Sequence, residues 1–213
     1  IVNALKFLAQ NDSSSFDRQR VQQAFDAEDT HEINGSWNAI NWCKGEDILI
    51  VGSGPSLKKY ASSIESFVIK SGVKVLSLNY HNEIKDGLIS AYVAADAKRF
   101  TLDAKRYNKI QKPIIMPGRL VDGGVLGELH GAEVKDYDLK VTPGATKFCD
   151  TGCEISSRLS AAYAVALCAT GGAKRIFFVG FDGYNAEDHR QIEMTHAFEL
   201  LKAELGDTEL ISL

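Results

Sequence analysis

The sequence has no excess of positive charge and no long apolar run. It carries 24 Lys and Arg against 28 Asp and Glu, which gives a formal net charge of −4. A chain that binds nucleic acid or a membrane surface by general electrostatic attraction would show a basic excess. No apolar run approaches the ~20 residues of a transmembrane helix, and the start of the chain lacks the pattern of a signal peptide. We therefore expect a cytoplasmic protein that binds a small molecule, not nucleic acid, and has no transmembrane segment.

Cysteine is scarce, and its spacing gives no metal-binding motif. The four cysteines are Cys43, Cys149, Cys153 and Cys168. No Cys-x-x-Cys pair occurs and no histidine lies at ligand spacing near them, so we expect no zinc site. Reduced thiols, the usual state in the cytosol, are the expectation.

The chain divides into two regions of different pattern. Residues 1–45 place apolar residues at helical spacing around a Ser-rich break, in a segment too short for a domain, and the chain starts at Ile1 instead of Met. We predict a helical connector that follows an upstream domain of a longer protein. Residues 46–213 alternate apolar strands with helices, which predicts an α/β domain with a doubly wound, mostly parallel, Rossmann-like sheet.

Three helices of this domain carry specific expectations. The strongest predicted helix covers residues 151–172 and ends at a Gly-Gly pair. In the helix over 56–70, Tyr60 is expected on the buried face together with Leu57 and Ile64. In the helix over 192–205, Ile192 is expected to pack against the sheet. Residues 117–148 are Gly-rich and show no clear period.

The segment DILIVGSGPSLKKY, which starts at Asp47, ends a predicted strand with a Gly-rich turn. Glycines allow a close backbone approach to a ligand, and Pro55 fits the first turn of a helix. The N–H groups of such a turn favour a phosphate. A tight turn without a ligand is an equal alternative. Neither Gly-x-Gly-x-x-Gly nor a Walker loop is present, which disfavours dinucleotide oxidoreductases and P-loop ATPases.

Polar residues follow the other predicted strands, where ligands of parallel sheets bind. Asn79 could read a base or a sugar, or could occupy a left-handed turn. Asp96 could hold a ribose hydroxyl or a metal, or could cap a helix. Thr151 and the N–H groups after it could give a second phosphate contact, which we expect to share one crevice with the Gly54 turn. His189 could be a base or a solvated surface histidine.

Five segments in this order resemble the bacterial sialyltransferases that use CMP-sialic acid on a single Rossmann-like domain. They are ILIVGSGPSL, LSLNYHNEI, AYVAADAKRF, DTGCEISS and RIFFVGFDGY. The same pattern is typical of flagellin-glycosylating motility accessory factors and archaeal hydroxymethylpterin diphosphokinases. The resemblance covers roughly residues 47–213.

This resemblance implies roles for individual residues. Tyr184 would help hold the donor phosphate, and His189 would be the general base on the acceptor hydroxyl. The implied nucleotide-binding residues are Gly52, Ser53, Gly54, Pro55, Ser56, Asn79, Asp96, Thr151, Gly152 and Asp182. Two departures stand out: Asp96 replaces an asparagine, and only residues 185–188 lie where the sialyltransferases have a long lid. Residues 117–148 are the candidate replacement for that lid.

A second resemblance concerns the first 42 residues. They are similar to the tail that follows the TIM-barrel domain in proteins resembling hydroxy-oxovalerate aldolases, some of which end in a Gly-Pro-Ser-Leu domain.

The first functional hypothesis is a glycosyltransferase-like domain for a CMP-linked nonulosonic acid, in surface-glycan biosynthesis, without a certain cofactor. The alternatives are a non-catalytic C-terminal domain of a putative aldolase and an ATP-dependent pterin diphosphokinase, in which Asp96 and Asp182 would hold Mg²⁺.

Overall fold

The first strand of the large sheet is an interior strand that is buried on both faces. In the computed structural model, which describes residues 31–107, 109–121, 129, 132–185 and 188–213, strand β1 (Asp47–Val51) alternates its side chains between two apolar clusters. Ile48 and Ile50 enter one cluster, and Leu49 and Val51 enter the other. All four side chains are fully buried. A strand of this kind requires helices on both faces of its sheet.

The sheet has seven strands in the order β10-β9-β1-β2-β3-β4-β5, and each pair of neighbouring strands is parallel. The predicted α/β, Rossmann-like fold is thereby confirmed. The strands other than β1 are β2 (Lys74–Leu78), β3 (Ala91–Val93), β4 (Ile114–Met116), β5 (Val134–Asp136), β9 (Arg175–Val179) and β10 (Glu209–Ser212).

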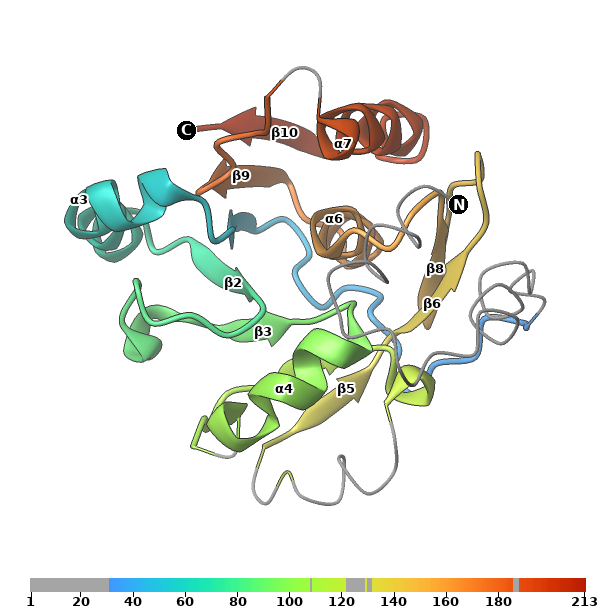
Figure 1. Cartoon of the computed structure of the whole chain (residues 1–213), viewed down its shortest axis with the longest axis horizontal. Coiled ribbons are helices and arrows are strands. Elements are labelled where there is room, and N and C mark those ends of the chain that lie inside the picture. Colours follow the sequence, from blue (N-terminus) through green and yellow to red (C-terminus); the bar gives the residue numbers. More distant parts are fainter. Residues whose placement is uncertain (1–30, 108, 122–128, 130–131, 186–187) are drawn as a thin grey trace, which may run out of the picture. The chain divides into compact units, whose positions relative to one another are not determined.

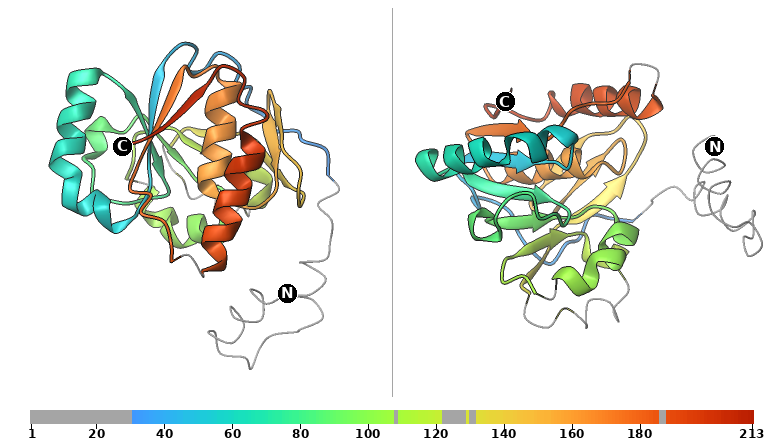
Figure 2. Two further views of the ribbon diagram at one scale, coloured as in Figure 1. Left: turned by 90° about the horizontal axis from the view of Figure 1, so that it is seen from above. Right: turned by 60° about the vertical axis from the view of Figure 1, so that its left-hand side comes forward.

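Helices cover the two faces of this sheet (Figures 1 and 2). Helices α3 (Pro55–Ser71) and α4 (Ala97–Tyr107) pack their apolar residues on the Leu49 side. Helices α6 (Ser160–Thr170) and α7 (His189–Leu201) cover the Ile48 side. Two short 3₁₀ helices, η2 (Asp86–Leu88) and η3 (Gly118–Leu120), lie in the connections. Pro55 occupies the first turn of α3, as predicted.

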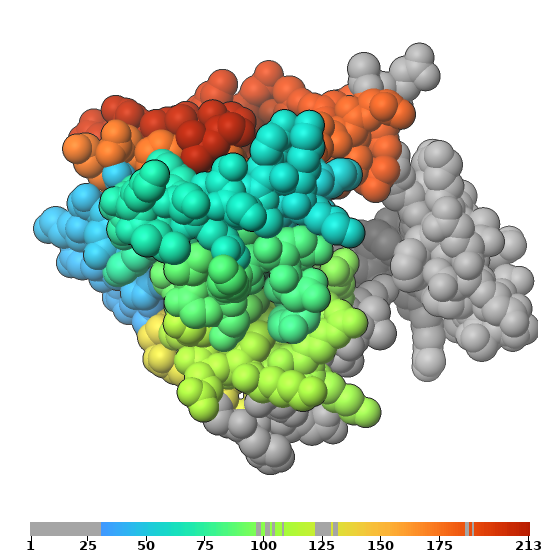
Figure 3. Space-filling view, turned by 90° about the vertical axis from the view of Figure 1, so that its left-hand side faces the viewer, coloured from blue at the N-terminus to red at the C-terminus, as the bar shows by residue number. Residues whose placement is uncertain are grey.

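One face of the molecule shows surface segments whose sequence of colours agrees with the strand order (Figure 3). Bands of colour follow one another from the C-terminal segment to α3, then to the connections after β2, then to the region around α4.

Tyr60 of α3 is 49% exposed and Ile192 of α7 is 64% exposed, so the predictions that bury these two side chains are wrong. No helix in the described part of the chain combines the length and apolarity needed to cross a bilayer.

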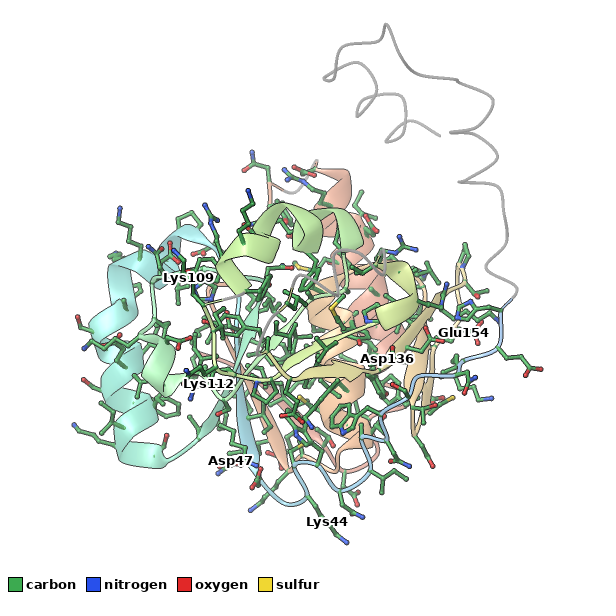
Figure 4. All side chains as sticks on the ribbon, turned by 90° about the horizontal axis from the view of Figure 1, so that it is seen from below. Lys44, Asp47, Lys109, Lys112, Asp136 and Glu154 are labelled. Atoms are coloured by element: carbon green, nitrogen blue, oxygen red, sulfur yellow. The ribbon has the colours of Figure 1, made fainter. Side chains whose placement is uncertain are left out.

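A second, three-stranded sheet replaces the first part of the predicted helix over 151–172. Its order is β6-β8-β7, formed by β6 (Asp138–Val141), β7 (Lys147–Cys149) and β8 (Gly152–Ile155). Cys153 and Ile155 are buried on either side of Glu154, which is the period of a strand. The N–H of Asp138 bonds the carbonyl of Thr151 at 2.8 Å, so sheet pairing takes the backbone groups that a helix would use. Glu154 marks this strand in Figure 4.

The predicted helical connector fails over its described portion. Residues 1–30 lie outside the described residues, but residues 32–45 form turns and extended chain and belong to the same compact unit as the rest of 32–213. The N–H groups of Trp37, Ala39 and Cys43 bond the carbonyls of Asp136, Asp150 and Gly171. Lys44 and Asp47 mark the junction of this segment with β1 (Figure 4).

Candidate functional site

A pocket lies at the point where the order in which strands are added to the sheet reverses. Strands β2 to β5 lie on one side of β1, whereas β9 and β10 lie on the other side. Ligands of open α/β sheets bind outside the carboxyl ends of the strands at such a switch point. The pocket there, which we call the switch-point pocket, encloses about 400 Å³. It is lined by Gly52, Ser53, Gly54, Pro55, Leu78, Asn79, Leu159, Ser160, Ala161, Gly180, Phe181, Asp182, Gly183, Tyr184, Arg190 and Met194.

Two glycine loops cross at the floor of the switch-point pocket. The N–H of Gly52 bonds the carbonyl of Val179, and the N–H of Gly54 bonds the carbonyl of Gly180, each at 2.9 Å. A Cβ on Gly52 would lie 2.6 Å from the Gly180 oxygen. Gly180 itself has φ +71°, a left-handed conformation that favours glycine. The glycines therefore allow these two backbone segments to lie close together, and this role does not depend on a bound ligand.

The N-terminus of α3 already faces a negative charge from the same chain. The N–H and the hydroxyl of Ser56 donate to Asp182 Oδ2 at 3.1 and 2.9 Å. A Cβ on Gly54 would overlap this carboxylate. An additional anion at this helix end would be repelled by the negative charge of Asp182. It would also compete with Asp182 for the same hydrogen-bond donors. The predicted phosphate position around Gly54 is thus taken by an intramolecular group.

The N-terminus of α6 lines the same pocket and differs in this respect. Leu159 is its N-cap residue, no side chain caps it, and no acidic residue lies in its first turn. Ser160 and Ala161 line the pocket. The first N–H groups of a helix have no intrahelical partner and favour an anion. Thr151 and Gly152, the predicted second phosphate contact, instead lie on the hairpin between β7 and β8 and do not line this pocket.

Among the described residues that line the switch-point pocket, Arg190 carries a positive charge. Its guanidinium carbon lies 4.1 Å from the centre of the Tyr184 ring. Asp188 accepts from Arg190 at 2.7 Å, and this partner raises the pKa of Arg190, which stays protonated. The N–H of Tyr184 donates to Gln191 Oε1 at 2.9 Å, so Tyr184 and Arg190 are held over the first turn of α7. Sequence reasoning missed Arg190, although it lies next to the predicted base His189.

Asn79 occupies the left-handed turn that was one of its two predicted roles, while contact with a base or a sugar stays a prediction. Its φ is +58°, and its N–H bonds the carbonyl of Val93 at 2.9 Å, so it occupies a left-handed turn after β2. It also lines the switch-point pocket. Its Oδ1 atom is buried and has no hydrogen-bond partner among the described residues. An unsatisfied buried acceptor costs about 1–3 kcal/mol, which a donor from a ligand would recover.

The remaining predicted residues lie elsewhere. Asp96 accepts from the N–H of Arg99 at 3.0 Å, so it caps α4 and does not line the pocket. Ser56 lines a neighbouring hollow and not the switch-point pocket. His189 is the first residue of α7, but its side chain lies outside the described parts, and its role as a base stays a prediction. The described residues of 117–148 do not line the pocket as a cover.

The acidic groups do not gather into a metal site. Among the described residues, no group of three or more His, Cys, Asp or Glu side chains could hold a metal ion. The four cysteines are free thiols, as expected.

Comparison of the sequence with protein-family models finds no match, and neither does comparison with curated proteins.

Proposed function

We propose that residues 46–213 bind the nucleoside monophosphate part of an activated sugar and form a glycosyltransferase-like domain. One observation carries the proposal: the uncapped N-terminus of α6 and the guanidinium of Arg190 line the same pocket at the switch point of the sheet. Both favour a phosphate. The side chain of Asn79 and the loop from Gly52 to Pro55 are available to the nucleoside.

The charge of the pocket matches one phosphate better than three. The α6 N-terminus and Arg190 supply positive charge, but Asp182 also lines the pocket and Asp188 pairs with Arg190, so the charge of the pocket suits at most one phosphate. A triphosphate with Mg²⁺ needs carboxylates at the crevice, but Asp182 is held by Ser56 and Asp96 caps α4. The pocket thus favours a nucleoside monophosphate donor over the diphosphokinase alternative. The resemblance to CMP-sialic acid-dependent enzymes supports CMP and an acidic nine-carbon sugar.

Sugar transfer from such a donor releases the nucleoside monophosphate with additional negative charge. Preorganised donors at the leaving group stabilise this charge as it develops. Arg190, held by Asp188 and Tyr184, and the α6 N-terminus would do so. His189 is the proposed base on the acceptor hydroxyl.

Titration calorimetry with CMP, UMP, AMP, CDP and ATP, each with and without Mg²⁺, tests the binding step. We expect CMP to bind without Mg²⁺, and Arg190→Gln to weaken CMP about tenfold, because a charge-assisted hydrogen bond is lost. Lys202→Gln, at the exposed far end of the same helix, removes the same charge and should leave affinity unchanged. Equal affinities for the Arg190→Gln and Lys202→Gln variants would refute the proposed phosphate position.

Release of CMP from CMP-N-acetylneuraminate separates the transferase from a non-catalytic domain. His189→Ala should abolish release with little change in CMP affinity, because a base acts mainly on the transition state. Tight binding without any release by the wild-type chain would favour the non-catalytic alternative, a ligand-binding domain of an aldolase-type protein.

A further inference from the structure

A second polar hollow lies across Ser53 from the switch-point pocket. It encloses about 370 Å³ and is lined by Ser53, Tyr80, His81, Asn82, Glu83, Arg99 and Arg106. Residues 80–83 follow β2, and α4 follows β3, so this hollow also opens at the carboxyl edge of the parallel sheet. Ser53 lines both spaces. Two ligands bound in them would therefore be neighbours.

The two arginines of this hollow are held in place by a buried carboxylate. Asp103, 6% exposed, accepts from Arg99 Nε at 3.1 Å and from Arg106 NH1 at 2.8 Å. The Arg106 guanidinium also lies 5.5 Å from the Tyr80 ring centre, and Tyr80 in turn stacks on Tyr92. The contacts with Asp103 use one nitrogen of each guanidinium. The other N–H groups of these half-exposed side chains can donate to an anion in a fixed geometry.

His81 is buried in the wall of the hollow, and its side chain is 7% exposed. Nδ1 lies 3.2 Å from Glu83 Oε2, an oxygen that also accepts from the N–H of Asn82. Nε2 has no hydrogen-bond partner among the described residues. Burial lowers the pKa of His81, so the ring is neutral near pH 7. A buried polar ring of this kind costs stability unless something else binds it.

We propose that this hollow, the Arg99–Arg106 site, binds the carboxylate or phosphate of a second small molecule that also carries hydroxyl groups. Arg99 and Arg106 would hold the anionic group on the α4 side. Glu83, Asn82 and His81 would accept from or donate to hydroxyls on the other side, where the Glu83 charge excludes a second anion. Binding itself does not depend on the nucleotide; only the role of this ligand as the acceptor of a transferred sugar rests on the proposed function.

Three probes that share a polyol body test the ligand chemistry. Calorimetric titration of the full chain with gluconate, glucose 6-phosphate and glucose should show binding of one or both acids and none of glucose. A preference between the acids identifies a carboxylate or a phosphate as the anchor. Binding of glucose as tight as that of the acids, or no binding of either acid, would overturn the proposal.

Two variants locate the site. Arg99→Gln should weaken the acid about tenfold or more, because a charge-assisted hydrogen bond is lost. Lys105→Gln, an exposed residue of the same helix outside the hollow, loses the same charge and should leave binding unchanged. Equal effects of the two substitutions would show that only the general charge of α4 matters, against the proposal.

His81→Phe separates a ligand-binding histidine from a structural one. We expect weaker acid binding with a melting temperature equal to or above that of the wild type, because an unsatisfied polar group is removed. A lower melting temperature with unchanged acid affinity would overturn the role of His81. CMP affinity should be the same in Arg99→Gln and wild type. A wild-type chain that binds the acid but not CMP would refute the proposed function and leave this site, whereas a wild-type chain that binds CMP but neither acid would refute this site.

Discussion

Helices α3 and α6 both begin beside the switch-point pocket, and their N-termini differ in the charge that they face. The first turn of α3 contacts the carboxylate of Asp182, whereas the first turn of α6 has no capping side chain. The Gly-rich loop before α3 is the one that looks like a phosphate loop, yet its donors are used within the chain. The plain Leu159–Ser160 start of α6 leaves its donors for a ligand. A glycine-rich sequence thus indicates close backbone packing as readily as a ligand site.

The strongest disruption of this arrangement is Gly54→Val. A side chain here would overlap Asp182 and lie against the Gly180 carbonyl, with 2.6 Å from that oxygen to the Cβ. We expect a loss of about 3 kcal/mol or more in unfolding free energy, measured by urea denaturation, because backbone and cap must both shift. Gly87→Val, at a position with open space, is the matched control and should change little. Wild-type stability of the Gly54→Val variant would show that the loop is not packed as described.

Ser160→Asp makes the N-terminus of α6 resemble that of α3. The new carboxylate would favour the helix but occupy the proposed phosphate position, where like charges repel. CMP affinity should fall at least about tenfold, while thermal stability stays the same or rises. Ser160→Asn is the neutral isostere and should bind CMP nearly as the wild type does. An unaffected Ser160→Asp variant would move the phosphate away from α6.

Asp182→Asn tests the N-terminus of α3, the other helix in this comparison. It weakens the cap of α3 and should cost about 1 kcal/mol in chemical unfolding. CMP affinity should stay equal or increase, because a negative charge leaves the pocket. A clear fall in CMP affinity would instead favour the sequence-based prediction that Asp182 contacts the nucleotide.

The smallest effect concerns the other end of β1. Asp47 accepts from Arg175 Nε at 2.8 Å, and this contact lowers the pKa of Asp47 below its ordinary value of 3.8. A lowered folded-state pKa stabilises the protein above pH 3.8 and loses that effect as pH falls through the folded value. Asp47→Asn should therefore lower the melting temperature at pH 7 by only about 2–4 °C or less, since the pair is partly exposed. The difference from the wild type should shrink toward pH 3; a constant difference would assign the effect to packing.

The large elements of the fold follow from local patterns, whereas the small sheet does not. The apolar strands β1, β2 and β9 and the amphipathic helix α3 were predictable from periodicity. Residues 152–155 were misassigned because Ile155 and Leu159, four positions apart, fit a helical stripe as well as a strand followed by a new helix. Pairing with β6 and β7 decides between them, and pairing partners are not visible in a local pattern.

The site was predictable in outline, because the strand-end rule leads to Gly52, Asn79 and Tyr184. The electrostatics of the site were not predictable from the sequence. Asp182 and Ser56 are 126 positions apart in sequence, and only the fold shows that the carboxylate caps α3. Asp96 follows its strand in the same way, but its helix turns the carboxylate to the N–H of Arg99.

The segment before β1 has a consequence for the order of events during synthesis. Its backbone partners at Asp136, Asp150 and Gly171 are translated long after Trp37, Ala39 and Cys43. At about 5–20 residues per second, the ribosome delivers these partners roughly 5–25 s later. Until then the segment has no surface to dock on, and β1 lacks its neighbour β9. The nascent chain must therefore keep β1 and the segment before it from forming other contacts until β9 has been made.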